Sequence, residues 1–332
     1  LLEEELDRGT CPEDIGFFTF TKQAVQEGKS RAMSRFGITN NQLPFFRTLH
    51  SLCFFQLGLS KDSVMGARDL NDLNQKLNLR LTGSISSDDG HVSGISKDDR
   101  LMFIENLARM RQVSLETQWH ESDDVVGWFA LERFANGLRL FKNDRLLIDY
   151  TDMLQLFLDR GRAPRLDVMF VDEAQDLSPL QWAVVRKLCE SADRIYIAGD
   201  DDQAIYRWAG ADVDYLIRNS KDAMVLKQSY RIPKSIHTLA ERCIGQVASR
   251  VQKTWNPRKE AGHVSWEKSY ESIDMESGDW LVLARTNYLL NGIEEHCRSE
   301  GWFYKTKNRN SVSEKKVKAV RDWETLRKGG EI

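Results

Sequence analysis

The chain has 332 residues, of which 41% are hydrophobic and 29% charged, and its formal net charge is −3. This composition is typical of a globular protein with two or three lobes, and it excludes a basic field over the whole molecule, so any nucleic acid would be held by a local groove. No apolar run approaches the ~18 residues that a membrane-spanning helix needs. Five widely spaced cysteines without a Cys-x-x-Cys pair favour free thiols in a reducing cytoplasm over a zinc site.

The N-terminal residues Leu1 to Leu6 have neither the charge pattern nor the cleavage site of a signal peptide. They are typical of the middle of a helix. We therefore expect the chain to start partway through a domain.

Apolar runs suited to buried strands alternate with helical patterns along the chain. Strands are expected at Ile15–Phe20, Val168–Val171, Ile195–Ala198, Met224–Leu226 and Trp280–Ala284. Helices are expected at Thr21–Phe36, Ser178–Cys189, Pro233–Val247, Leu289–Glu300 and Val317–Leu326. This alternation predicts an α/β fold with parallel sheets flanked by helices.

The stretch from about Leu57 to Leu147 interrupts the alternation. It is polar and mostly helical in pattern, with a loop rich in Gly, Ser and Asp over Thr82–Ser96. We expect a helical insertion over residues 58–146 between two parts of a first domain, residues 1–57 and 147–221. A boundary near Asn219–Met224 then predicts a second domain over residues 222–332.

The strongest motif follows the expected strand Val168–Val171, where Asp172 and Glu173 stand side by side. Open α/β sheets bind their ligands at the carboxyl ends of their strands. One carboxylate can hold a magnesium ion, and the next can orient or deprotonate a water that attacks a phosphate. A solvated acidic loop is the alternative for a lone Asp-Glu pair, but other parts of a nucleotide site follow in order.

The second motif is Gly199-Asp200-Asp201-Asp202-Gln203-Ala204-Ile205-Tyr206, with Trp208 two residues further on. A glutamine beside a magnesium-carboxylate strand can reach a terminal phosphate and report its hydrolysis to the residues that follow. Tyr206 and Trp208 are suited to stacking on bases. The alternative makes Trp208 a core aromatic.

Two weaker motifs flank these. In Gln228-Ser229-Tyr230-Arg231, the arginine can supply charge to a transferring phosphate and the tyrosine can stack on a purine. Near the N-terminus, Phe20 could stack on a base, and Thr48 and His50 could bind a phosphate. A buried phenylalanine and a helix cap are the alternative there.

The tripeptide Gly28-Lys29-Ser30 imitates the end of a phosphate-binding loop. That loop needs a glycine five residues earlier, where this chain has Gln23. The preceding strand is also expected to end at Phe20, so we expect Lys29 to lie inside a helix.

Taken together and in order, these stretches resemble a superfamily 1 DNA helicase of the UvrD/Rep/PcrA type, which is built on RecA-like P-loop NTPase sheets. Asp172–Asp176 resembles the Walker B motif of that family, and Gly199–Trp208 is similar to its motif III. Gln228–Arg231 is similar to motif IV. Thr19–Lys22 and Thr48–Ser51 resemble motifs Ia and Ib, and Leu283–Asn287 resembles the Arg-Thr-Asn strand of the second RecA-like lobe.

The resemblance implies a role for each matching residue. Asp172 would bind Mg²⁺, Glu173 would be the catalytic base, and Gln203 would sense the γ-phosphate. Tyr230 would stack on adenine next to Gln228, and Arg231 would be the arginine finger. The residues implied to bind DNA are Phe20, Thr48, His50, Tyr206, Trp208 and Arg285. The implied partners are ATP, single-stranded DNA or a single/double-strand junction, and repair or replication proteins, with movement 3′ to 5′.

Several departures from the family pattern limit what the chain does alone. The phosphate-binding loop and the C-terminal motifs of the family are absent from these residues, and Ala209 stands where an arginine often follows the motif III tryptophan. Because backbone N–H groups and the lysine of that loop anchor the phosphates, we expect the chain to be nearly inert with ATP. We expect it to be an internal piece of a longer helicase.

Two other functions stay open. The chain could be a non-catalytic module that binds single-stranded nucleic acid or a repair partner, although a binder has no use for Asp172, Glu173, Gln203 and Arg231 together. It could also act on RNA, because stacking tracks tolerate either sugar. Residues preceding Leu1 would decide the first question, and binding to matched DNA and RNA oligomers at fixed salt would decide the second.

Overall fold

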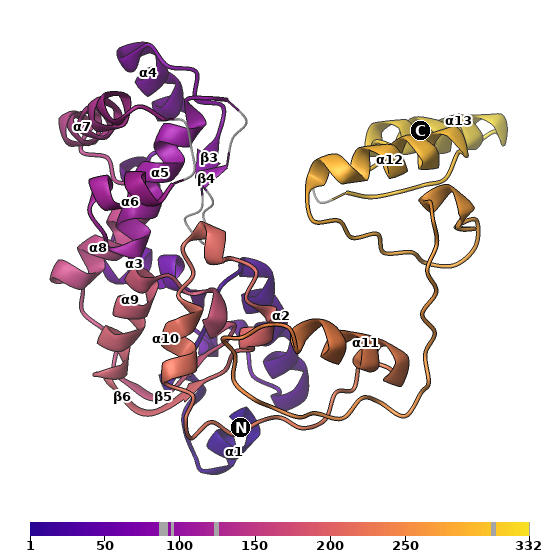
Figure 1. Cartoon of the computed structure of the whole chain (residues 1–332), viewed down its shortest axis with the longest axis horizontal. Coiled ribbons are helices and arrows are strands. Elements are labelled where there is room, and N and C mark those ends of the chain that lie inside the picture. Colours follow the sequence, from indigo (N-terminus) through magenta and orange to yellow (C-terminus); the bar gives the residue numbers. More distant parts are fainter. Residues whose placement is uncertain (86–91, 94–95, 123–125, 307–309, 332) are drawn as a thin grey trace. The chain divides into compact units, whose positions relative to one another are not determined.

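The computed structural model describes residues 1–85, 92–93, 96–122, 126–306 and 310–331. The first unit contains a parallel sheet with strand order β2-β1-β5-β6, of which β5 and β6 are labelled in Figure 1. The strands are β1 (Ile15–Thr19), β2 (Phe46–Thr48), β5 (Leu166–Val171) and β6 (Ala192–Ile197). The expected parallel α/β architecture is therefore confirmed.

Helices flank this sheet. They are α2 (Lys22–Phe36), α3 (Leu49–Gln56), α8 (Tyr150–Arg160), α9 (Pro179–Cys189) and α10 (Val213–Arg218), with the short α1 (Leu2–Asp7) at the N-terminus. Strand β5 is buried on both faces, because Met169 and Val171 join a cluster with Leu154 and Trp182, whereas Val168 joins a second cluster. This confirms that its apolar run forms a strand covered on both sides.

The tripeptide that imitates a phosphate-binding loop lies inside α2, as expected. Helix α2 begins after Thr21, whose hydroxyl accepts a hydrogen bond from the backbone N–H of Ala24 at 3.2 Å. A Cβ atom at Gly28 would lie 2.9 Å from the ring of Phe17 in β1. Glycine at this position therefore lets the helix pack closely on the sheet.

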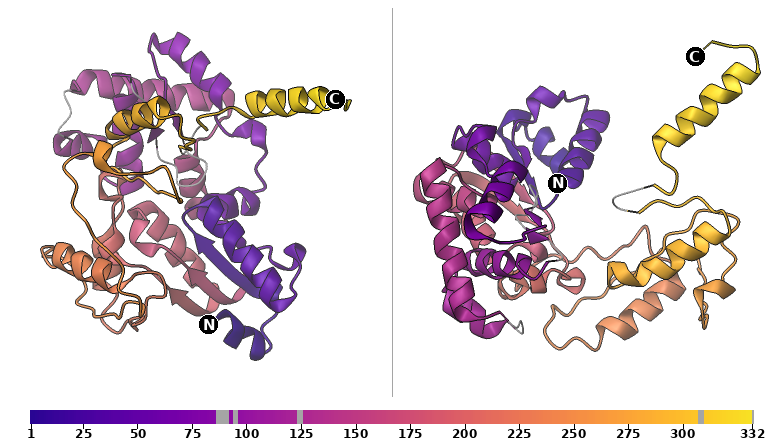
Figure 2. Two further views of the ribbon diagram at one scale, coloured as in Figure 1. Left: turned by 90° about the vertical axis from the view of Figure 1, so that its right-hand side faces the viewer. Right: turned by 90° about the horizontal axis from the view of Figure 1, so that it is seen from above.

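The insertion contains α4 (Ala67–Leu77), α5 (Asp99–Arg111), α6 (Leu115–Glu121) and α7 (Trp128–Arg145), and two short antiparallel strands, β3 (Ser84–Ile85) and β4 (Val92–Ser93). Its helices lie together, away from the sheet (Figures 1 and 2), around a hydrophobic cluster of their own that includes Leu73, Ile104 and Leu131. Much of the loop expected over Thr82–Ser96 lies outside the described residues.

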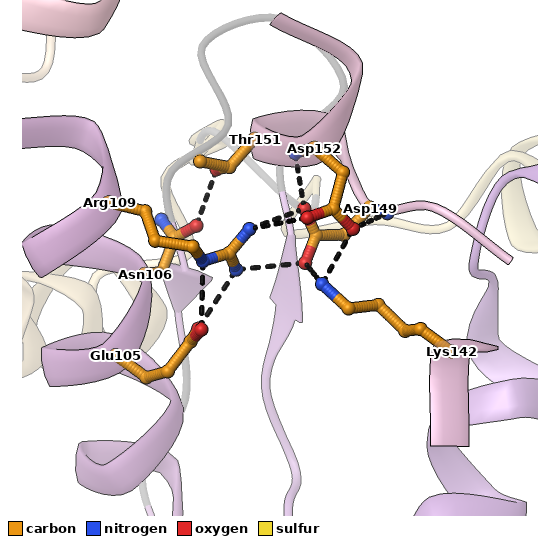
Figure 3. A network of polar contacts seen from close by, with 7 residues as sticks. All are labelled: Glu105, Asn106, Arg109, Lys142, Asp149, Thr151 and Asp152. Carbon is orange, nitrogen blue, oxygen red and sulfur yellow. Dashed lines mark hydrogen bonds and ion pairs between the residues drawn. The ribbon is translucent and has the colours of Figure 1, made fainter. Parts of the chain in front are cut away.

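A buried ionic network joins the insertion to α8 (Figure 3). The carboxylate of Asp149 accepts hydrogen bonds from Arg109 of α5 at 2.8 Å and from Lys142 of α7 at 2.7 Å. The same carboxylate caps α8 by accepting from the backbone N–H of Asp152 at 2.8 Å. Glu105 also binds Arg109. Buried charges are tolerated only when they are paired in this way.

Short 3₁₀ turns connect several of these elements. They are η1 (Pro12–Asp14), η2 (Asn40–Gln42), η3 (Lys61–Ser63), η4 (Ala174–Asp176), η5 (Asp201–Gln203), η6 (Arg207–Ala209), η7 (Tyr270–Ser272) and η8 (Asn287–Leu290).

Backbone contacts divide the chain into two compact units. The first contains Leu1–Ser229 and Ala240–Asn256, and the second contains Tyr230–Leu239 and Pro257–Ile332. Helix α11 (Lys234–Ile244) begins in the second unit and ends in the first. The second unit also has α12 (Asn291–Ser299) and α13 (Glu314–Arg327), at two places where helices are expected. The expected domain division at residues 57, 147 and 222 stays a prediction.

The strands expected at Met224–Leu226 and Trp280–Ala284 are wrong. Neither segment forms a strand, and the described residues after 222 contain only isolated β-bridges. The apolar side chains of Leu226, Leu281 and Leu283 are 80–82% exposed. A buried parallel strand needs hydrogen-bonding neighbours on its edges, and the described part of the chain places none beside these segments.

The structure also bears on membrane-spanning helices and on the cysteines. No helix in the described ranges is long and apolar enough to cross a lipid bilayer. All five cysteines are free thiols.

Candidate nucleotide and nucleic-acid site

Three chain segments meet where parallel strands of the sheet end. They follow β1, β5 and β6. The backbone N–H of Asp172 donates to the carbonyl of Phe18 at 2.8 Å, and that of Ala174 donates to the carbonyl of Ala198 at 3.0 Å. These bonds extend the sheet pairing beyond the strands, so the expected motifs after β5 and β6 lie next to each other.

The carboxylates that follow β5 occupy an electrostatically unfavourable position. Asp172 is half-buried and Glu173 is exposed. Burial raises the pKa of the Asp172 carboxyl, and the neighbouring Glu173 carboxylate raises it further. Burial and Glu173 together raise the pKa of Asp176 to about 6, and one Asp176 oxygen is buried without a hydrogen-bond partner. A bound cation would relieve this concentration of negative charge.

Glu173 has a strained backbone. Its φ of 56° and ψ of 40° lie in the left-handed region, which side chains other than glycine rarely adopt. Such a conformation costs on the order of 1–3 kcal/mol and occurs often at functional sites. Glu173 lies in the turn between β5 and η4, where the sequence predicts the catalytic base.

Gln175 connects the motifs after β5 and β6. Its side chain is buried, its amide nitrogen donates to Glu173 Oε2 at 2.6 Å, and its carbonyl oxygen accepts from the backbone N–H of Asp200 at 3.0 Å. A Cβ atom at Gly199 would lie 2.9 Å from that same oxygen. Sequence reasoning missed this role, and the only local signals are a polar residue within the Walker B-like motif and a glycine after β6.

Gln203 continues this series of hydrogen bonds. Its side-chain nitrogen donates to Asp200 Oδ2 at 2.5 Å, and its side chain is exposed. Glu173, Gln175, Asp200 and Gln203 therefore form a continuous polar series that crosses from one motif to the other. A shift of the Glu173 side chain can therefore reach the loop after β6 through these hydrogen bonds.

Two basic residues hold that loop in place, and sequence reasoning missed both. Arg250 binds the Asp202 carboxylate through two hydrogen bonds of 2.7 and 2.6 Å. Lys253 pairs with Asp200 and Asp202 at 3.0 Å and also with Asp201. Burial alone would raise the pKa of Asp202, but the hydrogen bonds from Arg250 and Lys253 hold it below its usual value.

Aromatic rings extend from the sheet edge towards solvent. Phe20 lies 5.5 Å from Tyr206 between ring centroids, and Tyr206 lies 6.5 Å from Trp208. Phe20 is buried, whereas Trp208 is 63% exposed. A large indole exposed at the end of such a series has the chemistry of a base-stacking platform.

The other residues predicted near this edge are buried. Thr48 is the N-cap of α3, where its hydroxyl accepts from the backbone N–H of Ser51 at 3.2 Å. His50 is buried and packs edge-on against Tyr150, with 5.9 Å between ring centroids. The structure gives Thr48 the capping role that was the alternative, and the DNA contacts of Thr48 and His50 stay predictions.

Residues 228–231 lie where the first unit ends and the second begins along the chain. Gln228 forms an isolated parallel bridge with Asn256, and its side chain donates to the carbonyl of Ser229 at 2.8 Å. In the second unit, Tyr230 is 84% exposed, and Arg231 and Arg285 are also exposed. Their roles towards ATP and DNA stay predictions.

Comparison with known proteins gives the family. Residues 4–224 match the family model described as the UvrD/REP helicase N-terminal domain. The chain belongs to this family. The match covers the sheet, the insertion and the loop after β6, and it confirms the family resemblance.

Several curated helicases are similar to this member of the UvrD/REP family. The ATP-dependent DNA helicase PcrA of Bacillus subtilis is 25% identical over 345 residues, which cover 98% of this chain and 44% of PcrA. A probable DNA helicase II homolog of Rickettsia conorii is 24% identical, over 89% of this chain and 50% of the relative. One from Mycoplasma capricolum is 28% identical, over 68% of this chain and 33% of the relative. The chain thus spans about half the length, or less, of these relatives.

The carboxylates of this UvrD/REP member fit one kind of metal site. Among the residues that the structure describes, no group of three or more His, Cys, Asp or Glu side chains is arranged to hold a metal ion. Mg²⁺ does not require such a cage, because it keeps several waters and binds one or two carboxylates together with substrate phosphates. The half-buried Asp172 carboxylate, with its raised pKa, fits that mode.

Proposed function

We propose that the chain is part of the motor core of an ATP-dependent DNA helicase or translocase that moves 3′ to 5′ along single-stranded DNA. The membership in the UvrD/REP family and the similarity to a protein named ATP-dependent DNA helicase support this proposal. One observation carries it. Hydrogen bonds through Gln175 join the predicted catalytic carboxylate to the loop that bears Trp208.

In this proposal the nucleotide binds where strands β1, β5 and β6 end. Asp172 would hold Mg²⁺, and the ion would supply positive charge to the phosphates of the nucleotide. Glu173 accepts a proton from the attacking water, and Gln203 contacts the γ-phosphate. Tyr230 stacks on adenine beside Gln228, and Arg231 supplies positive charge to the transferring phosphoryl group.

The nucleic acid follows the aromatic series. A base stacks on the exposed indole of Trp208, and Tyr206 and Phe20 support that ring from the sheet side. Thr48, His50 and Arg285 are assigned to the same strand. Because the net charge is −3, the phosphate contacts depend on local groups and not on a basic field over the whole molecule. The free cysteines agree with a reducing cytoplasm. Repair or replication proteins are the partners that we propose for the whole protein.

The polar series also couples ATP hydrolysis to the loop that stacks on DNA. When the γ-phosphate leaves, Gln203 loses its contact and its hydrogen bond with Asp200 is free to rearrange. Trp208 lies five residues after Gln203 on the same short loop. A shift at Gln203 therefore moves the stacking platform without a long relay.

We propose that the 332 residues alone bind DNA without turning over ATP. They contain no Gly-x-x-x-x-Gly-Lys-Ser/Thr segment. Removing one preorganised phosphate contact costs about 3 kcal/mol of transition-state stabilisation, and the whole loop supplies several.

The test is equilibrium binding of the chain to labelled oligo-dT, a blunt duplex and a matched RNA at fixed salt, with phosphate release measured in parallel. We expect oligo-dT to bind most tightly, Trp208→Ala to weaken that binding about fivefold or more, and phosphate release to stay at background. Failure to bind single strands would contradict the motor assignment, tighter RNA binding would contradict the choice of DNA, and rapid ATP turnover would contradict the proposed inactivity.

A further inference from the structure

One face of helix α5 packs against the loop after β6. Four residues of α5 share this face because they are spaced by three or four positions along the helix. They are Arg100, Phe103, Leu107 and Arg111.

Glycine makes the close approach possible. A Cβ atom at Gly210 would lie 2.8 Å from Cδ1 of Leu107 and 3.4 Å from Cγ of Arg111. Gly210 also has a φ of +97°, which other residues rarely adopt. The loop that carries Trp208 is therefore seated directly on the insertion, and its position depends on α5.

The ring of Phe103 stacks on the indole of Trp208. Their centroids are 6.2 Å apart and their planes differ by 17°. A nearly parallel pair at this separation is typical of an offset stack, which fixes ring orientation. Phe103 is half-buried, whereas Trp208 keeps 63% of its surface exposed. Phe103 therefore supports the indole and leaves much of it open to a ligand.

A cation stands beside this stack. The guanidinium carbon of Arg100 lies 5.3 Å from the centroid of the Phe103 ring, and the Arg100 side chain is exposed. A planar guanidinium matches the geometry of a phosphate, and arginine also stacks on aromatic rings. Stacked aromatic rings with an adjacent arginine are the combination that binds a base and its neighbouring phosphate in single strands.

We propose that the nucleic-acid track continues beyond Trp208 onto helix α5 of the insertion. Phe103 is a positioning residue that holds the Trp208 ring for base stacking, and Arg100 contacts a backbone phosphate of the same strand. This rests on the proposed single-strand binding of the chain. It adds two residues, from an element outside the recognised motifs, that set how tightly the strand is held.

The experiment measures binding of fluorescein-labelled oligo-dT to the chain over a series of salt concentrations. Phe103→Ala is expected to weaken binding about fivefold or more, and Phe103→Tyr to restore it. Arg100→Ala is expected to reduce the slope of log K against log salt by about 0.7, the value for one lost phosphate contact on a single strand. In a Trp208→Ala background, Phe103→Ala is expected to add no further loss, since it acts through Trp208.

Matched controls come from helix α7 of the same insertion. Phe129→Ala removes a ring that is 82% exposed, and Arg133→Ala removes an exposed cation. Both are expected to bind like the unaltered chain. Circular dichroism checks folding, and Phe103→Leu replaces Phe103→Ala if the latter unfolds.

The outcomes separate this inference from the proposed function. If Trp208→Ala weakens binding while the Phe103 and Arg100 variants behave like the α7 controls, the extension onto α5 is wrong and the proposed function stands. If Phe103→Ala weakens binding equally with and without Trp208, the positioning role is wrong. If the unaltered chain binds no oligo-dT, the proposed function fails, and this inference fails with it.

Discussion

At the residue scale, the buried amide of Gln175 is the connection between the two central motifs. Its nitrogen and its oxygen are both used, at 2.6 Å to Glu173 and at 3.0 Å to the backbone of Asp200. A side chain that satisfies partners on two loops fixes their spacing. The position of Gln203 relative to Glu173 therefore depends on Gln175.

Replacing this side chain should destabilise the chain measurably. Gln175→Ala leaves the backbone N–H of Asp200 without its acceptor and is expected to lower the free energy of unfolding by about 1–3 kcal/mol. Urea unfolding measures the change. Gln155→Ala, at an exposed position of α8, is the control. Equal stability of the two variants would mean that the Gln175 bridge contributes nothing.

Asp176 gives a pH dependence with a defined sign. Burial and the nearby Glu173 raise its pKa from 3.8 to about 6. The folded protein therefore favours the protonated carboxyl. The stability contributed by that preference is complete below pH 3.8 and is lost as the pH rises through 6.

Asp176→Asn removes this loss. Relative to the unaltered chain, we expect the free energy of unfolding of the variant to rise by about 1 kcal/mol between pH 4 and pH 8. This value is reduced because the side chain is only half-buried. Thermal unfolding in EDTA at both pH values measures the gain without interference from metal ions. A stability difference that is the same at both pH values would rule out the raised pKa.

At the element scale, the ionic network of Arg109, Lys142 and Asp149 joins α5 and α7 to the start of α8 (Figure 3). Burial alone would raise the pKa of Asp149, but Arg109 and Lys142 hold it well below its usual value. This contribution to stability is present above pH 4 and is lost in strong acid as the carboxylate becomes protonated. The network therefore fastens the insertion at neutral pH.

Arg109→Ala tests how much this ionic network contributes to stability. It leaves the carboxylates of Glu105 and Asp149 with one cation fewer in a buried site, and we expect a loss of about 3–5 kcal/mol in unfolding free energy. Arg145→Ala breaks an exposed ion pair with Asp72 in the same insertion and should cost less than about 1 kcal/mol. A similar small loss for both variants would contradict a buried, structurally important network.

The elements also show what a sequence pattern can and cannot predict. The run Val168–Val171 forms a strand because both of its faces are covered, and the pattern of four apolar residues indicates this directly. The runs Met224–Leu226 and Trp280–Ala284 have similar composition but no strand beside them in the described chain. Apolarity is local information, whereas a strand also needs a partner that the pattern does not identify.

The same distinction applies to the site. Asp172, Glu173, Gln203 and Trp208 are identifiable because each lies at a fixed offset from a strand end. Arg250 and Lys253 reach the acidic loop from about 50 residues away in sequence, so no local spacing indicates them. Phe103 contacts Trp208 from the insertion, in a segment whose sequence contains none of the motifs.

At the scale of the whole molecule, a net charge of −3 makes nucleic-acid binding depend on local features of the surface. We assign those features to the loop after β6 and to the face of α5 that packs against it. We expect the first unit to bind DNA through its aromatic series, whereas ATP turnover needs a phosphate-binding loop motif that the 332 residues do not contain.

The most direct test of this assignment is amide hydrogen exchange of the chain with and without saturating oligo-dT, followed by mass spectrometry. We predict slower exchange in Gln203–Gly210 and in the first turns of α5 when DNA is bound, with exchange in α7 unchanged. Protection confined to α7 or to the second unit, with Gln203–Gly210 exchanging as in the free chain, would contradict it.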